Sequence, residues 1–190
     1  MTKPFLTEQD FQLAATRLNV EVAAIKAVCE VEAPRGGFNP DGTPVTLFEA
    51  HQFFKYTKGR FAQSHPTLCV PKWTRGLYGT TWQLEQQRLQ QAMALDHDAA
   101  LMSASWGKFQ VMGFNFATIG YTSVQEFVNL MYISEGEHLE AFCGYVEHNG
   151  LKDELQRHDW AGFAKGYNGA EFWKNSYDTK LATAYAKYKP

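Results

Sequence analysis

The chain has 190 residues and a mass of 21.6 kDa, which is the size of one compact domain. Hydrophobic residues make up 45% of the chain and charged residues 20%, a balance that excludes an intrinsically disordered protein. The formal net charge of −2 argues against a general nucleic-acid or membrane-surface binder. Aromatic residues reach 15%, more than a core of this size requires, so we expect some to line a groove for a ring-shaped ligand.

The charge is distributed unevenly along the chain. Residues 51–90 carry six Lys and Arg against one Glu, and residues 160–190 carry five Lys against two acids. Residues 91–159 carry ten acids against three bases. The basic stretches are either ordinary solvated surface or patches that face an anionic polymer.

The three cysteines, Cys29, Cys69 and Cys143, are far apart and form no C-x-x-C pair. Neither a disulfide framework nor a cysteine zinc site is indicated, and we expect the protein to fold in a reducing cytosol. The N-terminal segment has no apolar stretch of the signal-peptide type, and no apolar run approaches the ~20 residues of a membrane span.

The N-terminal part of the sequence predicts two helices. Thr7 and Asp10 mark the start of an amphipathic helix, and Asn19 ends it. A second helix over 20–33 is almost continuously apolar on its inner side, so we expect it to be central in the fold. Pro34 and the Gly pair that follows end this helix.

The next segment predicts a short β-hairpin, with Phe38 and residues 45–48 as its strands and a turn at 39–42. A brief helix over 50–58 and a long loop over 59–81 follow, and loops of that length usually carry function. Further helices are predicted over 82–101, 104–112, 123–133, 134–148, 159–166 and 177–188. The expected fold is mainly α: a single helical domain over residues 1–190 with one small β-hairpin beside the active-site cleft.

Glu32 is the first candidate for chemistry, at the C-terminal end of the central helix. The negative end of the helix dipole and the apolar neighbours both disfavour the charged carboxylate and raise its pKa. A general acid at neutral pH requires such a shift. The competing interpretation is a surface Glu at a frayed helix end. Glu30 points about 200° away around the helix, so the two carboxylates cannot share one site.

Glu49 is the second candidate, at the end of the apolar strand and the start of the next helix. It is either a helix N-cap partner or the second carboxylate of a glycosidase pair, brought opposite Glu32 by the hairpin. His51 either orients Glu49 or packs against its neighbours.

Two further segments carry groups that suit saccharide recognition. Within residues 103–115, which include Ser105, Gln110 projects from a predicted helix that otherwise faces the core. Its amide therefore needs a partner, either a sugar group or a backbone carbonyl. Tyr167 and Asn168, flanked by glycines at a helix end, offer a stacking face and an amide, or form an ordinary helix C-cap.

The sequence contains none of the common motifs for metal-dependent, nucleotide-binding or serine-nucleophile chemistry. It lacks H-E-x-x-H, a Walker loop, a nucleophile elbow and G-x-G-x-x-G. The one E-x-x-H, from Glu135 to His138, is unpaired, whereas di-metal bundles need two copies. The six histidines are dispersed, so we expect neither a metal nor another cofactor.

These features occur along the chain in an order that resembles a known group of proteins. A helix ending in Glu, a Gly-rich turn, a small-x-Trp-Gly-x-Phe-Gln-x-Met run and a Gly-Tyr-Asn-Gly segment resemble the lysozyme-like superfamily of goose-type lysozymes and soluble lytic transglycosylases. More closely, the chain is similar to the N-acetylmuramidase domain of bacteriophage endolysins from phages of Gram-negative hosts. The similarity extends over about residues 7–188, with matching stretches at 24–32, 36–38, 47–51, 104–113, 167–169 and 177–181.

The resemblance implies a peptidoglycan hydrolase that cleaves the β-1,4 bond between N-acetylmuramic acid and N-acetylglucosamine. Glu32 matches the catalytic acid of a motif usually written E-V-E-S, in which Ala33 here replaces the Ser. Glu49 matches the second carboxylate, in L-F-E-x-H. We expect inversion, because the hairpin would hold the two carboxylates on opposite walls of the cleft. The substrate-binding positions would be Phe38, His51, Ser105, Gln110, Tyr167 and Asn168.

Two other functions stay open at this point. A lytic transglycosylase needs only one catalytic acid and forms a 1,6-anhydro product, whereas hydrolysis gives a product heavier by one water. A non-catalytic peptidoglycan-binding module would bind the insoluble wall and release no soluble fragments.

The resemblance also implies a biological setting. We expect a monomeric endolysin that lyses its host, binds no nucleic acid and has no separate wall-binding domain. Without a signal peptide it would accumulate in the host cytoplasm and depend on a holin to reach the cell wall in the periplasm. Its basic stretches would contact anionic wall polymer or outer-membrane lipid.

Overall fold

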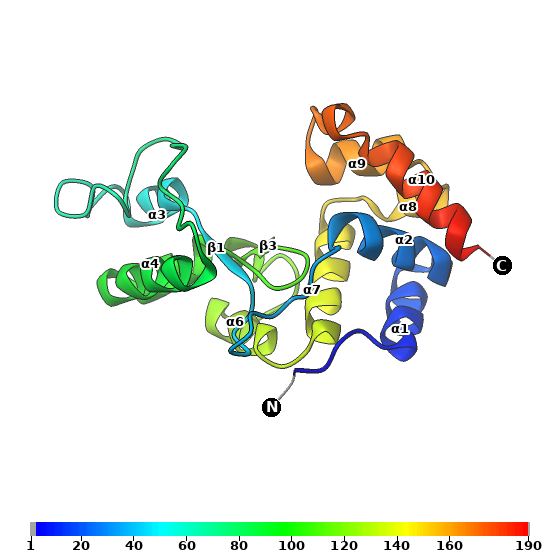
Figure 1. Cartoon of the computed structure of the whole chain (residues 1–190), viewed down its shortest axis with the longest axis horizontal. Helices are drawn as coiled ribbons and strands as arrows, with labels where there is room; N and C mark the ends of the chain where they lie inside the picture. Colours follow the sequence, from blue (N-terminus) through cyan, green and yellow to red (C-terminus); the bar gives the residue numbers. More distant parts are fainter. Residues whose placement is uncertain (1–2, 190) are drawn as a thin grey trace.

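The computed structural model describes residues 3–189, and Figure 1 shows its elements in two groups on either side of helix α7 (Glu135–His148). The first group contains α1 (Glu8–Leu18), α2 (Val22–Glu32), α8 (Lys152–Gln156), α9 (Trp160–Asn168), the short helix η2 (Phe172–Asn175) and α10 (Tyr177–Tyr188). The second contains α3 (Ala50–Thr57), α4 (Trp82–Leu95), α5 (His97–Met102), η1 (Gly113–Asn115), α6 (Val124–Met131) and three strands, β1 (Thr46–Phe48), β2 (Ala104–Trp106) and β3 (Val111–Met112). The prediction of a mainly helical fold is confirmed.

The first two helices follow their local sequence signals. Thr7 and Asp10 form a capping box, in which the Asp10 carboxylate accepts the Thr7 N–H at 2.7 Å and Thr7 Oγ1 accepts the Asp10 N–H at 3.3 Å. Asn19 ends α1 in the left-handed conformation, with φ 52°. Helix α2 buries most of its length against α1 and α10, so the predicted apolar inner side is confirmed. The helix that lies between the two groups is α7 and not α2, so α2 is central only within its own group.

The observed sheet has one strand more than the predicted hairpin, and its strands pair differently. It has three antiparallel strands in the order β1-β2-β3, and β1 pairs with β2 so that Leu47 lies opposite Ser105. Of the predicted hairpin, the structure retains the turn at 39–42, a single bridge between Phe38 and Pro44, and the second strand, which is β1 and pairs with β2.

The prediction of a helix over 104–112 is wrong, because these residues form the hairpin β2–β3. Gly107 has φ 70° and Gln110 has φ 50°, and both values are incompatible with a right-handed helix. The turn is tied to the neighbouring segment, since the Gly107 N–H donates to the Val45 carbonyl at 2.8 Å.

The predicted helix over 82–101 is divided into α4 and α5 at Asp96. This residue is extended, with φ −157° and ψ 102°, and its carboxylate caps α5 by accepting the Ala99 N–H at 3.2 Å.

Residues 59–81 contain turns but no helix or strand, as predicted. The short helix α8 is not predicted by the sequence pattern. Within residues 3–189, no helix combines the length and the hydrophobicity that a membrane span needs.

A row of aromatic rings packs through the core beside α9. Phe109 stacks on Phe142 with ring centroids 4.7 Å apart, and Phe142 meets the edge of Tyr167 at 5.5 Å. Tyr167 in turn stacks on Phe163 at 5.7 Å. Such pairs stabilise beyond the area that they bury, and this row fixes the C-terminal end of α9 against the β2–β3 hairpin.

Replacing Phe142 by Ala tests this packing. The side chain is fully buried, so we expect a loss of about 3–5 kcal/mol in the free energy of unfolding. In a chain of this length the melting temperature should fall by roughly 6–20 °C, measured by circular dichroism. Leu13→Ala is the control, because Leu13 is 55% exposed and its loss should change the melting temperature little.

Candidate active site

Two adjoining cavities form a groove, and both are lined by Glu32 and Gln110. The first, here called the Trp82 cavity, has a volume of about 560 Å³ and is also lined by residues 33–36, Phe38, Asn39, Pro40, Val45, Trp82, Gly107 and Lys108. The second, the Tyr145 cavity, has a volume of about 510 Å³ and is also lined by Phe109, Val111, Met112, Phe114, Asn115, Tyr145, Asn149, Tyr167, Asn168 and Tyr177. Several of the abundant aromatic residues therefore do line a groove.

Glu32 lies where the two cavities meet. It is the last residue of α2, and the chain leaves the helix through Ala33, whose φ of −132° is not helical. The carboxyl group is partly buried, and its Oε1 accepts the Nδ2–H of Asn168 at 2.9 Å. Burial raises the pKa of Glu32 above its ordinary value, while the Asn168 hydrogen bond and the positive charge of Lys180 oppose that shift. A carboxyl group in this setting is suited to donating a proton near neutral pH.

Tyr167 and Asn168 come to Glu32 from the C-terminal end of α9. The Tyr167 hydroxyl donates to the Phe109 carbonyl at 3.1 Å, while its ring belongs to the aromatic row. Asn168 is the last residue of α9, and Gly169 then turns the chain away with φ 86°. The segment is therefore both a helix end and part of the wall of the Tyr145 cavity.

Gln110 lies in the β2–β3 turn and not on a helix, which corrects the expectation from the sequence. Its Nε2–H donates to the carbonyl of Gly107 at 2.8 Å and to that of Val45 at 3.2 Å. Its Oε1 accepts the Ser105 hydroxyl at 2.8 Å. Ser105 is buried and lines neither cavity, so its contact is with Gln110. The side-chain amide thus holds the turn together while the residue forms part of both cavity walls.

Phe38 lies in the wall of the Trp82 cavity, as the sequence indicated, and packs on the ring of His138 with centroids 4.8 Å apart. Trp82, Lys108 and Tyr145 also line the groove and were missed. The one sequence feature that points to Trp82 and Tyr145 is the high content of aromatic residues, and it does not indicate which of the rings line the groove.

Glu49 does not line either cavity. Its carboxylate accepts the Tyr78 hydroxyl at 2.8 Å and lies 3.2 Å from His51 Nδ1, in a small separate hollow. Tyr78 also accepts the indole N–H of the exposed Trp73 at 2.6 Å, so Glu49 is connected to the loop over 71–79. The prediction that His51 can orient Glu49 agrees with this contact, whereas the expected meeting of Glu49 with Glu32 across one cavity is not found.

Glu30 takes part in a different set of contacts. It is exposed and binds Lys187 Nζ at 2.7 Å and the Tyr188 hydroxyl at 2.5 Å, which ties α2 to the end of α10. The two carboxylates have different hydrogen-bond partners, which agrees with the prediction that they do not share one site.

The hydrogen bond from Asn168 can be tested by the Asn168→Leu variant. Because this bond favours the charged form of Glu32, its removal should raise the pKa of Glu32 further. The pKa can be followed by carbon-13 NMR of the glutamate side-chain carboxyl groups. Asn129→Leu, on the exposed side of α6, is the control and should leave the pKa unchanged. An unchanged or lower pKa in Asn168→Leu would contradict the assignment.

Comparison with known proteins identifies the family. The family described as muramidase, N-acetylmuramidase, matches residues 21–189. The crystal structure of the Burkholderia AP3 phage endolysin is similar, with a TM-score of 0.92 and 39% sequence identity over 99% of this chain and 73% of that chain. A comparison with curated protein sequences gives no significant match. Because the family match covers most of the chain, this protein belongs to the N-acetylmuramidases, glycosidases that act on peptidoglycan.

Proposed function

We propose that the protein hydrolyses the β-1,4 bond between N-acetylmuramic acid and N-acetylglucosamine, with Glu32 as the general acid. The observation that carries the proposal is the partly buried carboxyl group of Glu32 at the junction of two cavities. A glycan strand that fills both cavities places a glycosidic bond at this junction. Cavities of this size are typical of ligand sites, and their aromatic walls suit sugar rings.

In this mechanism Glu32 donates its proton to the glycosidic oxygen as the bond to the anomeric carbon breaks. The raised pKa makes the protonated form of Glu32 more populated than that of an ordinary glutamate. Once the proton has left, the Asn168 hydrogen bond and the charge of Lys180 stabilise the carboxylate that remains. A water molecule then adds to the anomeric carbon of N-acetylmuramic acid.

We assign to Glu49 the role of second carboxylate, which activates the water or stabilises the oxocarbenium-like transition state. The assignment rests on its place in the L-F-E-x-H motif and on the His51 contact, which holds the carboxylate. The competing role is structural, since Glu49 also anchors the loop over 71–79 through Tyr78. Inversion of the anomeric centre is part of the same proposal.

A lytic transglycosylase remains the nearest alternative. It is favoured by one specific observation, namely that Glu32 lines both cavities and Glu49 lines neither. The product would then carry a 1,6-anhydro ring in place of the added water. A non-catalytic binding module is disfavoured, because it has no need of a carboxyl group with a raised pKa in its groove.

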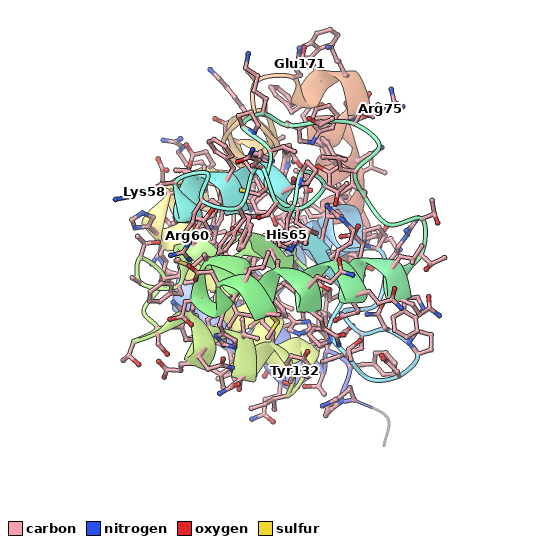
Figure 2. All side chains as sticks on the ribbon, turned by 90° about the vertical axis from the view of Figure 1, so that its left-hand side faces the viewer. Lys58, Arg60, His65, Arg75, Tyr132 and Glu171 are labelled. Atoms are coloured by element: carbon pink, nitrogen blue, oxygen red, sulfur yellow. The ribbon has the colours of Figure 1, made fainter. Side chains whose placement is uncertain are left out.

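We further propose that the chain acts as a monomeric endolysin. It would accumulate in the host cytoplasm, reach the periplasmic wall with the help of a holin and cause lysis of the host cell. Its exposed cations would contact anionic lipid or wall polymer. Figure 2 shows Lys58 and Arg60 at one edge of the face with α3 and α4, and Arg75 at the opposite edge. A contact of this kind would therefore be spread over the face.

Glu32→Gln tests the proposed acid. The amide keeps the size of the side chain and an acceptor for Asn168 but has no acidic proton, so the rate of wall solubilisation should fall at least about 100-fold. The measurement is the turbidity of a peptidoglycan suspension, with melting temperature and co-sedimentation showing that folding and wall binding persist. Glu30→Gln is the matched control on the same helix and should remain active. Full activity of folded Glu32→Gln would defeat the proposal.

Glu49→Gln and Tyr78→Phe together test the second carboxylate. If Glu49 takes part in catalysis, Glu49→Gln should lose activity by about 100-fold or more, whereas Tyr78→Phe should keep most of it. The rate of release of soluble fragments and the melting temperature are measured for both variants. Equal and small losses in the two variants would instead assign Glu49 to holding the loop.

A further inference from the structure

The mechanism above leaves two buried polar residues of helix α7 without a role. Glu135 and His138 lie in the first turns of α7 and form the E-x-x-H motif of the sequence. They are only 2% and 1% exposed, although each carries a titratable group. Buried polar groups must find hydrogen-bond partners, so their partners indicate what they do.

The Glu135 carboxylate holds the turn that follows Glu32. Its Oε1 accepts the N–H of Gly37 at 2.6 Å and lies 3.6 Å from Lys108 Nζ. Its Oε2 accepts the N–H of Leu6 at 3.3 Å. The carboxylate therefore fixes the backbone five residues after Glu32 and binds a residue of the β2–β3 turn.

His138 holds that second turn. Its Nδ1 accepts the N–H of Lys108 at 3.0 Å, and its Nε2 lies 2.7 Å from the Met131 carbonyl. A carbonyl only accepts, so Nε2 carries the proton and the ring is neutral. Lys108 Nζ in turn donates to the Arg35 carbonyl at 2.9 Å, which joins the two turns directly.

The glycines of both turns make room for the His138 ring. A Cβ atom at Gly37 would lie 2.4 Å from Nδ1 of His138, and one at Gly107 would lie 2.7 Å from Cγ. Both turns therefore pack directly against one imidazole. Gly107 and Lys108, together with Gly36 beside Gly37, line the Trp82 cavity.

We propose that Glu135 and His138 are positioning residues, which clamp the turn over 33–38 to the β2–β3 turn and so set the wall of the Trp82 cavity beside Glu32. The clamp rests on the proposed function, since it acts through Glu32. It requires a neutral His138, because a protonated imidazole cannot accept the Lys108 N–H. Burial favours the neutral form and lowers the pKa of His138, while the two charged groups that act on the ring are Glu135 and Lys108.

The test uses two variants of His138 that separate its two hydrogen bonds. In His138→Asn the side-chain oxygen can take the place of Nδ1 and accept the Lys108 N–H. In His138→Gln the amide reaches the place of Nε2 and the Met131 carbonyl, but leaves the Lys108 N–H without an acceptor. His148→Gln, at the exposed end of the same helix, is the control and should keep its activity.

We expect turnover of soluble glycan strands to fall on the order of 100-fold in His138→Gln, as misplacement near a catalytic group does, and to be largely restored in His138→Asn. In wild type, the amide proton signal of Lys108 should shift as acid protonates His138, and this shift should be absent in His138→Asn. Equal losses in both variants, in proportion to lowered melting temperatures, would overturn the positioning role. So would a Lys108 amide signal in wild type that does not respond to acid. An inactive Glu32→Gln beside a fully active, folded His138→Gln would overturn the clamp alone and leave the proposed function standing.

Discussion

The hydrogen bond between Asn168 and Glu32 joins two helix ends that are 136 residues apart in sequence, at the point where the two cavities of the groove meet. It places a donor on a carboxyl group whose pKa burial raises, and so opposes that shift. Two opposing effects thus act on one proton, since burial retains it and Asn168 with Lys180 stabilises the anion left behind. This balance is what a group that gives up and regains a proton requires.

The rest of the fold holds these two helix ends in place. Helix α2 is fixed between α1 and α10, and the row of aromatic rings fixes the end of α9 against the β2–β3 hairpin. On the other side of Glu32, the buried polar groups of α7 bind the backbone of both turns. Apolar packing therefore supports one cavity, and buried hydrogen bonds support the other.

How much the sequence predicts depends on whether the signal is local. The Thr7 capping box and the end of α2 before Pro34 depend on neighbouring residues, so both the helices and the place of Glu32 were predictable. The prediction of a helix over 104–112 is wrong because strands of two or three residues are too short to show a period. Its glycine and the left-handed Gln110 form a turn that only pairing with the β1 segment reveals.

The contacts of the site were less predictable than its helices. The position of Asn168 in the sequence does not indicate that its side chain donates a hydrogen bond to Glu32. The contact of Glu49 with Tyr78 depends on the conformation of a loop, and that loop has no periodic sequence pattern. Trp82 was missed because an aromatic residue at a helix start serves a core as often as a groove. The E-x-x-H pair was excluded as a metal motif, but its role in holding two turns depends on glycines that are distant in sequence.

The most direct test of the central claim is digestion of purified glycan strands in oxygen-18-labelled water, followed by mass spectrometry of the fragments. If Glu32 drives hydrolysis at the junction of the two cavities, each new reducing end is N-acetylmuramic acid with one labelled oxygen atom. Fragments that end in unlabelled 1,6-anhydro rings, or the absence of any fragments, would contradict the account.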